Sequence, residues 1–265
     1  MPTLRIMSFN VRGSFVNDGA NVWPARAALN VSTLKRHAPD LVGFQEIQTG
    51  NLETYARDWN GRRFERGPQY NNREPFCYPS VAWDPGKLTL ASRDEFWVSE
   101  TPEAYSASWE TACIRSAQLL RFAFEAGAPP LVFLNTHLDH VSKAARLEGA
   151  KLIVRKLEAL AKGAAAVVVT GDFNADPDGE PYAVFRDAGY RDAYRECGHA
   201  DGPDVFTFHA FTGRRVAKPD HGRIDWILLR DGARSIEARS FEILRDAEPP
   251  LYPSDHYPVV AEVEV

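Results

Sequence analysis

Residues 164–174 read AAAVVVTGDFN, an unbroken apolar run that leads directly into Gly171-Asp172-Phe173-Asn174. A short valine-rich run bounded by glycine predicts a strand buried on both faces. Asp172 and Asn174 follow where that strand ends. A carboxylate and a carboxamide at such a place can hold a divalent cation or orient a water toward a phosphate. The stretch therefore predicts an α/β protein with a polar site at a strand end.

Other predicted strands also end in polar residues. Strands are expected over residues 4–9, 40–44, 131–135, 223–229 and 259–265, each bounded by polar or turn residues. If their ends meet at one edge of the fold, they bring together a set of chemically useful side chains. The polar residues at or beside these strands are Asn10, Glu46, His137, Asp225, Asp255 and His256.

The chain also predicts an internal repeat. Amphipathic helices are expected over residues 23–37 and 141–162, and each lies between two predicted strands. The interval from Asn10 to Glu46 nearly equals that from His137 to Asp172. Further strands are expected over residues 118–125 and on either side of the turn Asp84-Pro85-Gly86.

Length and charge limit the class of protein. The 265 residues contain no linker or low-complexity tract, so a single domain spanning residues 1–265 is expected. A net charge of −5 argues against a protein that coats nucleic acid, although it is compatible with a cation site built from carboxylates. With no signal sequence and no long apolar segment visible, a cytoplasmic monomer without membrane contact is the default expectation. The three separated cysteines are expected to be reduced thiols.

Taken singly, the candidate residues leave alternatives open. Asn10 is a turn residue or a ligand, and His137 is structural or transfers protons. Asp225 either pairs with a buried histidine or faces solvent at a sheet edge, because an unpartnered buried carboxylate is costly. Arg115 either grips a phosphate bidentately or forms a surface ion pair.

The order of these motifs is more specific than any one of them, and it resembles the endonuclease/exonuclease/phosphatase superfamily. That family includes deoxyribonuclease I, exonuclease III-type repair enzymes, neutral sphingomyelinases and inositol polyphosphate 5-phosphatases. The resemblance covers nearly the whole chain, and it is stronger toward a bacterial subgroup with further shared motifs at residues 135–140 and 207–209. The series comprises Ser8-Phe9-Asn10-Val11, Gln45-Glu46, Asn135-Thr136-His137, Gly171-Asp172-Phe173-Asn174, Arg223-Ile224-Asp225 and Ser254-Asp255-His256.

The resemblance implies a four-layer α/β sandwich, in which two packed mixed sheets are flanked by helices. It also implies that Asn10, Glu46 and Asp255 gather Mg²⁺ or Mn²⁺. Asp172 and Asn174 would then position and activate the attacking water. The remaining implied roles are phosphate contact by His256, orientation of His256 by Asp225, phosphate binding or leaving-group protonation by His137, and a phosphate clamp by Arg115.

One departure from the family pattern concerns a glutamate that many relatives carry after the second helix. Cys77 stands at the corresponding place here, and Glu74 lies three residues earlier. The support that this glutamate gives to the strand-end histidine in relatives is therefore in question for His137.

The expected activity is divalent-metal-dependent hydrolysis of a phosphodiester, with a nucleic acid or nucleotide favoured as the substrate. The alternatives are a phosphorylated sugar, an inositol or lipid headgroup, and a catalytically inactive binding scaffold. Basic and aromatic loop residues near the site would favour nucleic acid. The candidates for such loops are Arg62, Arg63, Arg66, Tyr70 and Arg73, and Arg214, Arg215 and Lys218.

Overall fold

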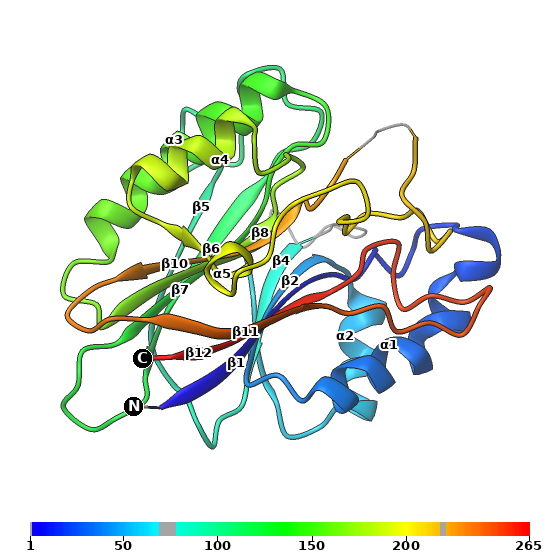
Figure 1. Cartoon of the computed structure of the whole chain (residues 1–265), viewed down its shortest axis with the longest axis horizontal. Coiled ribbons are helices and arrows are strands. Elements are labelled where there is room, and N and C mark those ends of the chain that lie inside the picture. The colour runs from blue at the N-terminus through cyan, green and yellow to red at the C-terminus, as the bar shows by residue number, and fades with distance from the viewer. Residues whose placement is uncertain (1, 69–77, 218–220) are drawn as a thin grey trace.

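The computed structural model describes residues 2–68, 78–217 and 221–265. Two mixed β-sheets pack face to face, and helices cover both outer faces (Figure 1). Three apolar cores separate the four layers: one between the sheets, one under α3 and α4, and one under α1 and α2. The four-layer α/β sandwich expected from the sequence is confirmed.

The first sheet has the strand order β11-β12-β1-β2-β4-β3, and the second has the order β5-β6-β7-β8-β10-β9. The strands of the first sheet are β1 (Thr3–Asn10), β2 (Leu41–Ile47), β3 (Arg63–Arg66), β4 (Tyr78–Trp83), β11 (Glu237–Ile243) and β12 (Val259–Glu264). Those of the second are β5 (Thr89–Trp97), β6 (Ser116–Ala123), β7 (Leu131–His137), β8 (Ala166–Asp172), β9 (Arg191–Asp192) and β10 (Asp225–Asp231). The helices are α1 (Trp23–His37), α2 (Thr49–Asp58), α3 (Lys143–Leu160), α4 (Glu180–Asp187) and α5 (Ala193–Glu196), with a 3₁₀ turn η1 at Gly19–Asn21.

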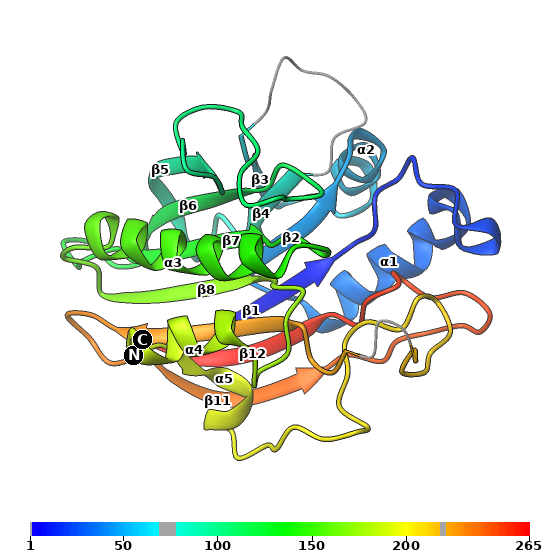
Figure 2. The ribbon, with the colours of Figure 1, turned by 90° about the horizontal axis from the view of Figure 1, so that it is seen from above.

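Each sheet is built around a β-α-β unit, as the internal repeat predicts. β1-α1-β2 forms the parallel pair of the first sheet, and β7-α3-β8 forms that of the second. The strands on either side also correspond, because β12 and β6 are antiparallel neighbours of β1 and β7, while β4 and β10 flank β2 and β8. β1 contacts β8 and β2 contacts β7 where the sheets meet (Figure 2).

The repeat explains where the polar strand ends gather. In each parallel pair the carboxyl ends lie at the same edge of the sheet, and the two pairs pack across one another. Asn10, Glu46, His137 and Asp172 therefore reach a common edge of the sandwich.

Two local details differ from simple strand patterns. The turn at Asp84-Pro85-Gly86 joins β4 to β5, which lie in different sheets. β2 carries a bulge after Phe44, and Glu46 within it has a left-handed backbone with φ +62°. A bulge re-aims a side chain, and here it turns the Glu46 carboxylate toward the edge where β1 and β8 end. Among the described helices, none is long and apolar enough to cross a membrane.

Candidate functional site

Asp172 is the centre of the polar cluster at the strand ends. Its Oδ2 accepts a hydrogen bond from Asn10 Nδ2 at 2.9 Å and lies 3.2 Å from His137 Nε2 and 3.7 Å from His256 Nε2. Its Oδ1 accepts the backbone N–H of Asn174 at 3.0 Å. All but Asn174 are buried. One carboxylate thus collects side chains from β1, β7 and the segment before β12.

The surroundings of Asp172 keep it ionised. Burial alone would raise the pKa of Asp172, but the charges of His137 and His256 and the hydrogen bond from Asn10 outweigh that effect. The pKa of Asp172 is therefore held well below its usual range. An ionised, buried carboxylate here can accept a proton or orient a water.

His256 is fixed from its other side by Asp225. The Asp225 Oδ2 atom lies 2.9 Å from His256 Nδ1, and Asp225 stands opposite Asp172 in the antiparallel pairing of β8 and β10. Burial opposes charging of the imidazole, but Asp225, Asp172 and Asp255 outweigh burial and raise the pKa of His256 to about 10. The Nε2–H of a charged His256 then points toward Asp172. This geometry resolves the alternative left open for Asp225, which is a buried partner of a histidine and not an edge residue.

His137 is oriented by Arg115. Arg115 Nη1 lies 3.1 Å from His137 Nδ1 and Asn174 Nδ2 lies 3.1 Å from His137 Nε2. Because a guanidinium can only donate, the bond from Arg115 forms when His137 is neutral with its proton on Nε2. That Nε2–H faces Asp172. Arg115 also reaches His140 Nδ1 at 3.5 Å. Arg115 is thus part of the cluster and not a separate surface ion pair.

The segment that carries Arg115 is anchored by Asp139, a residue whose role the sequence did not reveal. Its Oδ2 accepts from the Thr111 hydroxyl and from the N–H groups of Ala112 and Cys113, while its Oδ1 accepts two further N–H groups at the start of α3. Burial opposes the charge of Asp139, but these bonds lower its pKa to about 2.

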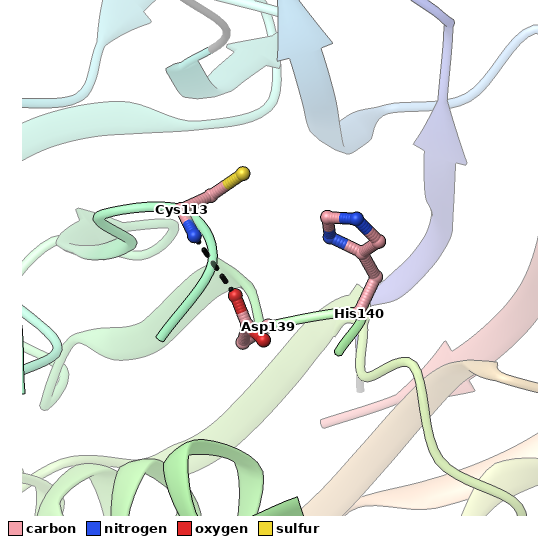
Figure 3. Close-up of side chains that lie close together, drawn as sticks. All are labelled: Cys113, Asp139 and His140. Atoms are coloured by element: carbon pink, nitrogen blue, oxygen red, sulfur yellow. Dashed lines mark hydrogen bonds between the residues drawn. The ribbon is translucent and has the colours of Figure 1, made fainter. Parts of the chain in front are cut away.

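Figure 3 shows Cys113 and His140 close to Asp139, a grouping that resembles a three-ligand metal site. Both Asp139 oxygens, however, are already occupied by N–H and O–H donors, including the Cys113 N–H drawn in the figure. The trio is therefore a loop anchor. A similar argument applies to Asp172, Asp225 and His256, because Asp225 and His256 are bonded to each other.

Two acids, the half-buried Glu46 and the buried Asp255, lie beside Asp172. Asn10 Nδ2 donates to Glu46 Oε1 at 3.2 Å, and Ser254 Oγ donates to Asp255 Oδ1 at 3.2 Å. Burial and the neighbouring charge of Glu46 raise the pKa of Asp255, although His256 opposes them. The pKa of Glu46 is lowered, since the charges of His137 and Arg12 overcome its burial.

This donor set fits a hard divalent cation. Two carboxylates at one edge offer the oxygen ligands that Mg²⁺ and Mn²⁺ prefer, and a cation between them would offset the repulsion from Glu46 that contributes to the raised pKa of Asp255. The side-chain oxygen of Asn10, Oδ1, accepts a hydrogen bond from the backbone N–H of Arg12 at 3.0 Å. The side-chain N–H₂ group of Asn10 bridges Glu46 and Asp172. Asn10 thus orients the carboxylates in this structure.

Two arginines near the acids were not anticipated from the sequence. Arg12 faces both Glu46 and Asp255, and Arg26 is fully buried beneath them. The Arg26 guanidinium donates to the backbone oxygens of Val11, Arg12, Asn21 and Pro253. It thereby ties the segment after β1 to the segment that carries Asp255. The sequence signal for Arg26 was its position, because a charged residue about one helical turn after Trp23 lies on the face of α1 that is expected to be buried.

The expected basic loop is only partly at the site. Arg62 and Arg63 lie at the opposite end of the sheet, because Arg63 pairs with Trp83 at the far end of β4, and Arg62 is bound to Asp84. Arg66, at the other end of β3, lies on the side of the site. Arg214 is exposed, and Arg215 donates to the backbone oxygens of residues 202 and 203. The remaining loop candidates and the two residues near the family glutamate lie outside the described residues; they are Tyr70, Arg73, Lys218, Glu74 and Cys77.

The endonuclease/exonuclease/phosphatase family model matches residues 7–256 of the chain. The chain belongs to this family. Members of the family are phosphoric ester hydrolases, so the chain is an enzyme of that class. The family resemblance of the ordered motifs is confirmed, and the match begins one residue before the motif that contains Asn10 and ends at His256.

Solved structures of family members have the same fold. An endonuclease/exonuclease/phosphatase from Bacteroides vulgatus is 26% identical with a TM-score of 0.88, over 100% of both chains. A mannosyl-6-phosphatase from Bacteroides thetaiotaomicron VPI-5482 is 25% identical with a TM-score of 0.87, over 99% of this chain and 100% of that one. TDP2 of D. rerio, solved with a single-strand DNA product, is 17% identical with a TM-score of 0.78 over 100% of both chains and shows the fold alone. The comparison with curated proteins found no match.

Proposed function

We propose that this family member is a divalent-metal-dependent phosphoesterase in which a water attacks phosphorus in line with the departing oxygen. One observation carries the proposal: Asp172 Oδ2 lies within 3.7 Å of the Nε2 atoms of two imidazoles, beside the half-buried Glu46 and the buried Asp255. An ionised carboxylate flanked by N–H donors suits the orientation of a water and the stabilisation of phosphate charge.

Glu46 and Asp255 are the residues that would hold Mg²⁺ or Mn²⁺, which when bound would neutralise charge on the phosphate and on the leaving oxygen. The sequence resemblance names Asn10 as a third ligand. The hydrogen bonds of Asn10 favour an orienting role, since its N–H₂ group holds the carboxylates of Glu46 and Asp172 at a fixed separation. Its oxygen keeps one lone pair beyond the bond from Arg12.

Residues of the second sheet, together with His256, transfer protons and contact the phosphate. Asp172, aided by Asn174, orients the water and takes its proton as the new phosphorus–oxygen bond forms. His256, held by Asp225, donates from Nε2 to a phosphate oxygen. His137 donates a hydrogen bond from Nε2 to the leaving oxygen, which takes up its proton from solvent, and Arg115 contacts the phosphate while holding His137 Nδ1.

We also propose that the chain acts as one catalytic domain. The residues assigned above come from both sheets, and neither sheet carries the acid pair and the Asp172 cluster together. Beneath them, Gln45 of the first sheet donates to Asn135 of the second at 2.7 Å, and Asn135 donates back to Phe44 O at 2.7 Å. These buried bonds lock the relative position of the two halves of the site.

For the substrate, the charges favour a compact phosphate ester over a long nucleic-acid strand. The net charge is −5, and Arg62 and Arg63 lie at the far end of the sheet from the site. A similar protein, 25% identical, is named as a mannosyl-6-phosphatase. A phosphorylated sugar is therefore the first substrate class to test. A nucleotide phosphodiester is the second, because Arg66 does lie at the site end of β3.

The test is an assay of purified protein with Mg²⁺, Mn²⁺ or EDTA on hexose 6-phosphates, p-nitrophenyl phosphate, bis(p-nitrophenyl) phosphate, DNA and RNA. Asp172→Asn and His256→Ala should each lower turnover by at least about 10²-fold while the fold survives, because each removes a proton-transfer or phosphate contact. Asp187→Asn, an exposed acid at the end of α4, is the control and should behave as the wild type. Metal-independent cleavage, or full activity in Asp172→Asn, would contradict the proposal.

A further inference from the structure

Arg12 lies in front of the two acids that we assign to the cation. Its Nη1 atom lies 3.9 Å from Glu46 Oε2, and its Nε atom lies 3.8 Å from Asp255 Oδ2. About a third of its side chain is exposed, so the guanidinium is at the rim of the site and not beneath it. A cationic side chain therefore shares the carboxylates that would bind a divalent cation.

The position of Arg12 is fixed by other contacts. Asp18 accepts bonds from Nε at 3.2 Å and from Nη2 at 3.0 Å, so one carboxylate holds the guanidinium from behind. The backbone of Arg12 is also held, since its carbonyl oxygen accepts from Arg26 and its N–H donates to Asn10. The left-handed backbone of Arg12, at φ +54°, is maintained by these bonds. The charge therefore cannot swing away at little cost when a cation arrives.

We propose that Arg12 couples cation binding to phosphate binding: it weakens the hold of Glu46 and Asp255 on a divalent cation and strengthens the hold of the site on a phosphate. The inference rests on the proposed function and adds a specificity residue to it. A cation about 2.1 Å from the carboxylate oxygens lies no more than about 6 Å from the Arg12 nitrogens. Even at the dielectric constant of water, the repulsion between a divalent and a monovalent cation about 6 Å apart raises the Kd of the divalent cation about tenfold.

A phosphate removes that conflict. A phosphate bound next to the cation, between it and the guanidinium, is attracted by both, and guanidinium groups bind phosphate oxygens bidentately. Cation and phosphate would then each favour the binding of the other, as coupled equilibria require. The site would be incompletely loaded with metal until its substrate arrives.

The experiment measures binding and does not depend on turnover. The Kd of Mn²⁺ is determined by electron paramagnetic resonance of free Mn²⁺, at neutral pH and low salt, for the wild type, Arg12→Gln, Arg12→Lys and Arg63→Gln. Arg63→Gln is the matched control, because it removes the same charge from the exposed far end of β3. The Kd of inorganic phosphate is then determined by calorimetry in saturating Mg²⁺, and circular dichroism checks the fold of each variant.

Arg12→Gln should bind Mn²⁺ about tenfold more tightly and phosphate about tenfold more weakly than the wild type. Arg12→Lys, which keeps the charge, should stay close to the wild type for Mn²⁺, and Arg63→Gln should match the wild type in both measurements. Unchanged or weaker Mn²⁺ binding in folded Arg12→Gln would overturn the inference and leave the proposed function standing. Failure of the wild type to bind Mn²⁺ at all would instead remove the proposed function.

Discussion

At the strand ends, Asp225 is hydrogen-bonded to His256 Nδ1, and the opposite nitrogen of that ring, Nε2, lies 3.7 Å from Asp172. Asp225 has one oxygen on His256 and lies in a buried position where its charge is otherwise costly. The carboxylate of Asp225 therefore depends on a protonated His256, and the charge of His256 depends on Asp225.

Asp225→Asn should lower the pKa of His256 from about 10 toward its ordinary range, since the Asp225 charge is the largest contribution opposing the effect of burial. The wild-type imidazole stays charged up to a pH near its raised pKa, whereas the variant loses its proton at a lower pH. Nuclear magnetic resonance titration of the His256 ring in EDTA-treated protein measures the change. An unshifted titration in the folded variant would show that Asp225 does not hold the proton on His256.

Asp139→Asn should destabilise the protein by about 2 kcal/mol at neutral pH, because asparagine offers one acceptor where five donors converge. The Asp139 pKa is lowered to about 2, so its stabilisation is fully present above the ordinary pKa and is lost as the pH falls through about 2. The difference between wild type and variant in urea unfolding should thus shrink as the pH falls below about 4. A difference that stays constant with pH would contradict an ionic origin.

At the scale of elements, β2 approaches the second sheet so closely that a side chain is excluded at Gly43. An added Cβ there would collide with Thr170 Oγ1 and Asn135 Oδ1. Asn135 is the residue that donates to Phe44 O and Ser80 O and accepts from Gln45, so the collision would fall on the bonds that join the sheets.

Gly43→Ala should therefore lower the free energy of unfolding by about 1–3 kcal/mol and reduce turnover, because overpacking would push the site-bearing strand ends apart. Gly202→Ala is the matched control, since an added Cβ there meets nothing within 4 Å. Chemical denaturation and steady-state kinetics compare the two variants. Equal stability of both would mean that the sheets do not touch at Gly43 as described.

The sequence predicts those elements that have a strong apolar period. The expected helix over residues 23–37 has the same bounds as α1, and the valine run from 164 becomes β8. α2, with little apolar periodicity beyond Leu52 and Tyr55, and the four-residue edge strand β3 were not predicted, because neither has a pattern that differs from a loop. Their order depends on packing against residues that are distant in the chain.

The same limit applies to the site. Asp172, His137 and Asp225 could be anticipated because a strand end fixes their position locally. Arg12 could not, because its significance comes from Glu46 and Asp255, which only the fold brings within 4 Å. The anchoring role of Asp139 could not, since three of its five donors lie in a loop 26–28 residues earlier.

For the whole molecule, the first and last strands are neighbours: β1 pairs with β12, and the Val265 N–H donates to the Pro2 carbonyl oxygen. The N and C ends of the chain lie close together (Figure 1). The turn after β4 connects the two sheets, and Pro85 and Gly86 in it are exposed. The chain can therefore be reconnected at one place and opened at another without cutting a sheet.

A circular permutant that joins the present ends through a short glycine-serine linker and opens between Pro85 and Gly86 should fold and keep the wild-type activity. The cut loosens the turn bonds that the N–H groups of Gly86, Lys87 and Leu88 donate to Asp84, and loop tips tolerate new termini. Circular dichroism, thermal unfolding and the phosphoesterase assay measure the outcome, with the unpermuted chain carrying the same linker as control. An unfolded permutant would show that β4 and β5 must be covalently joined for the sheets to assemble.

The correspondence of the two β-α-β units has an evolutionary implication. Each unit contributes one member to two pairs of equivalent positions, Asn10 with His137 and Glu46 with Asp172. Duplication of one such unit would account for the matching strand orders. The two units now supply different side chains, an amide and a carboxylate from the first and an imidazole and a carboxylate from the second.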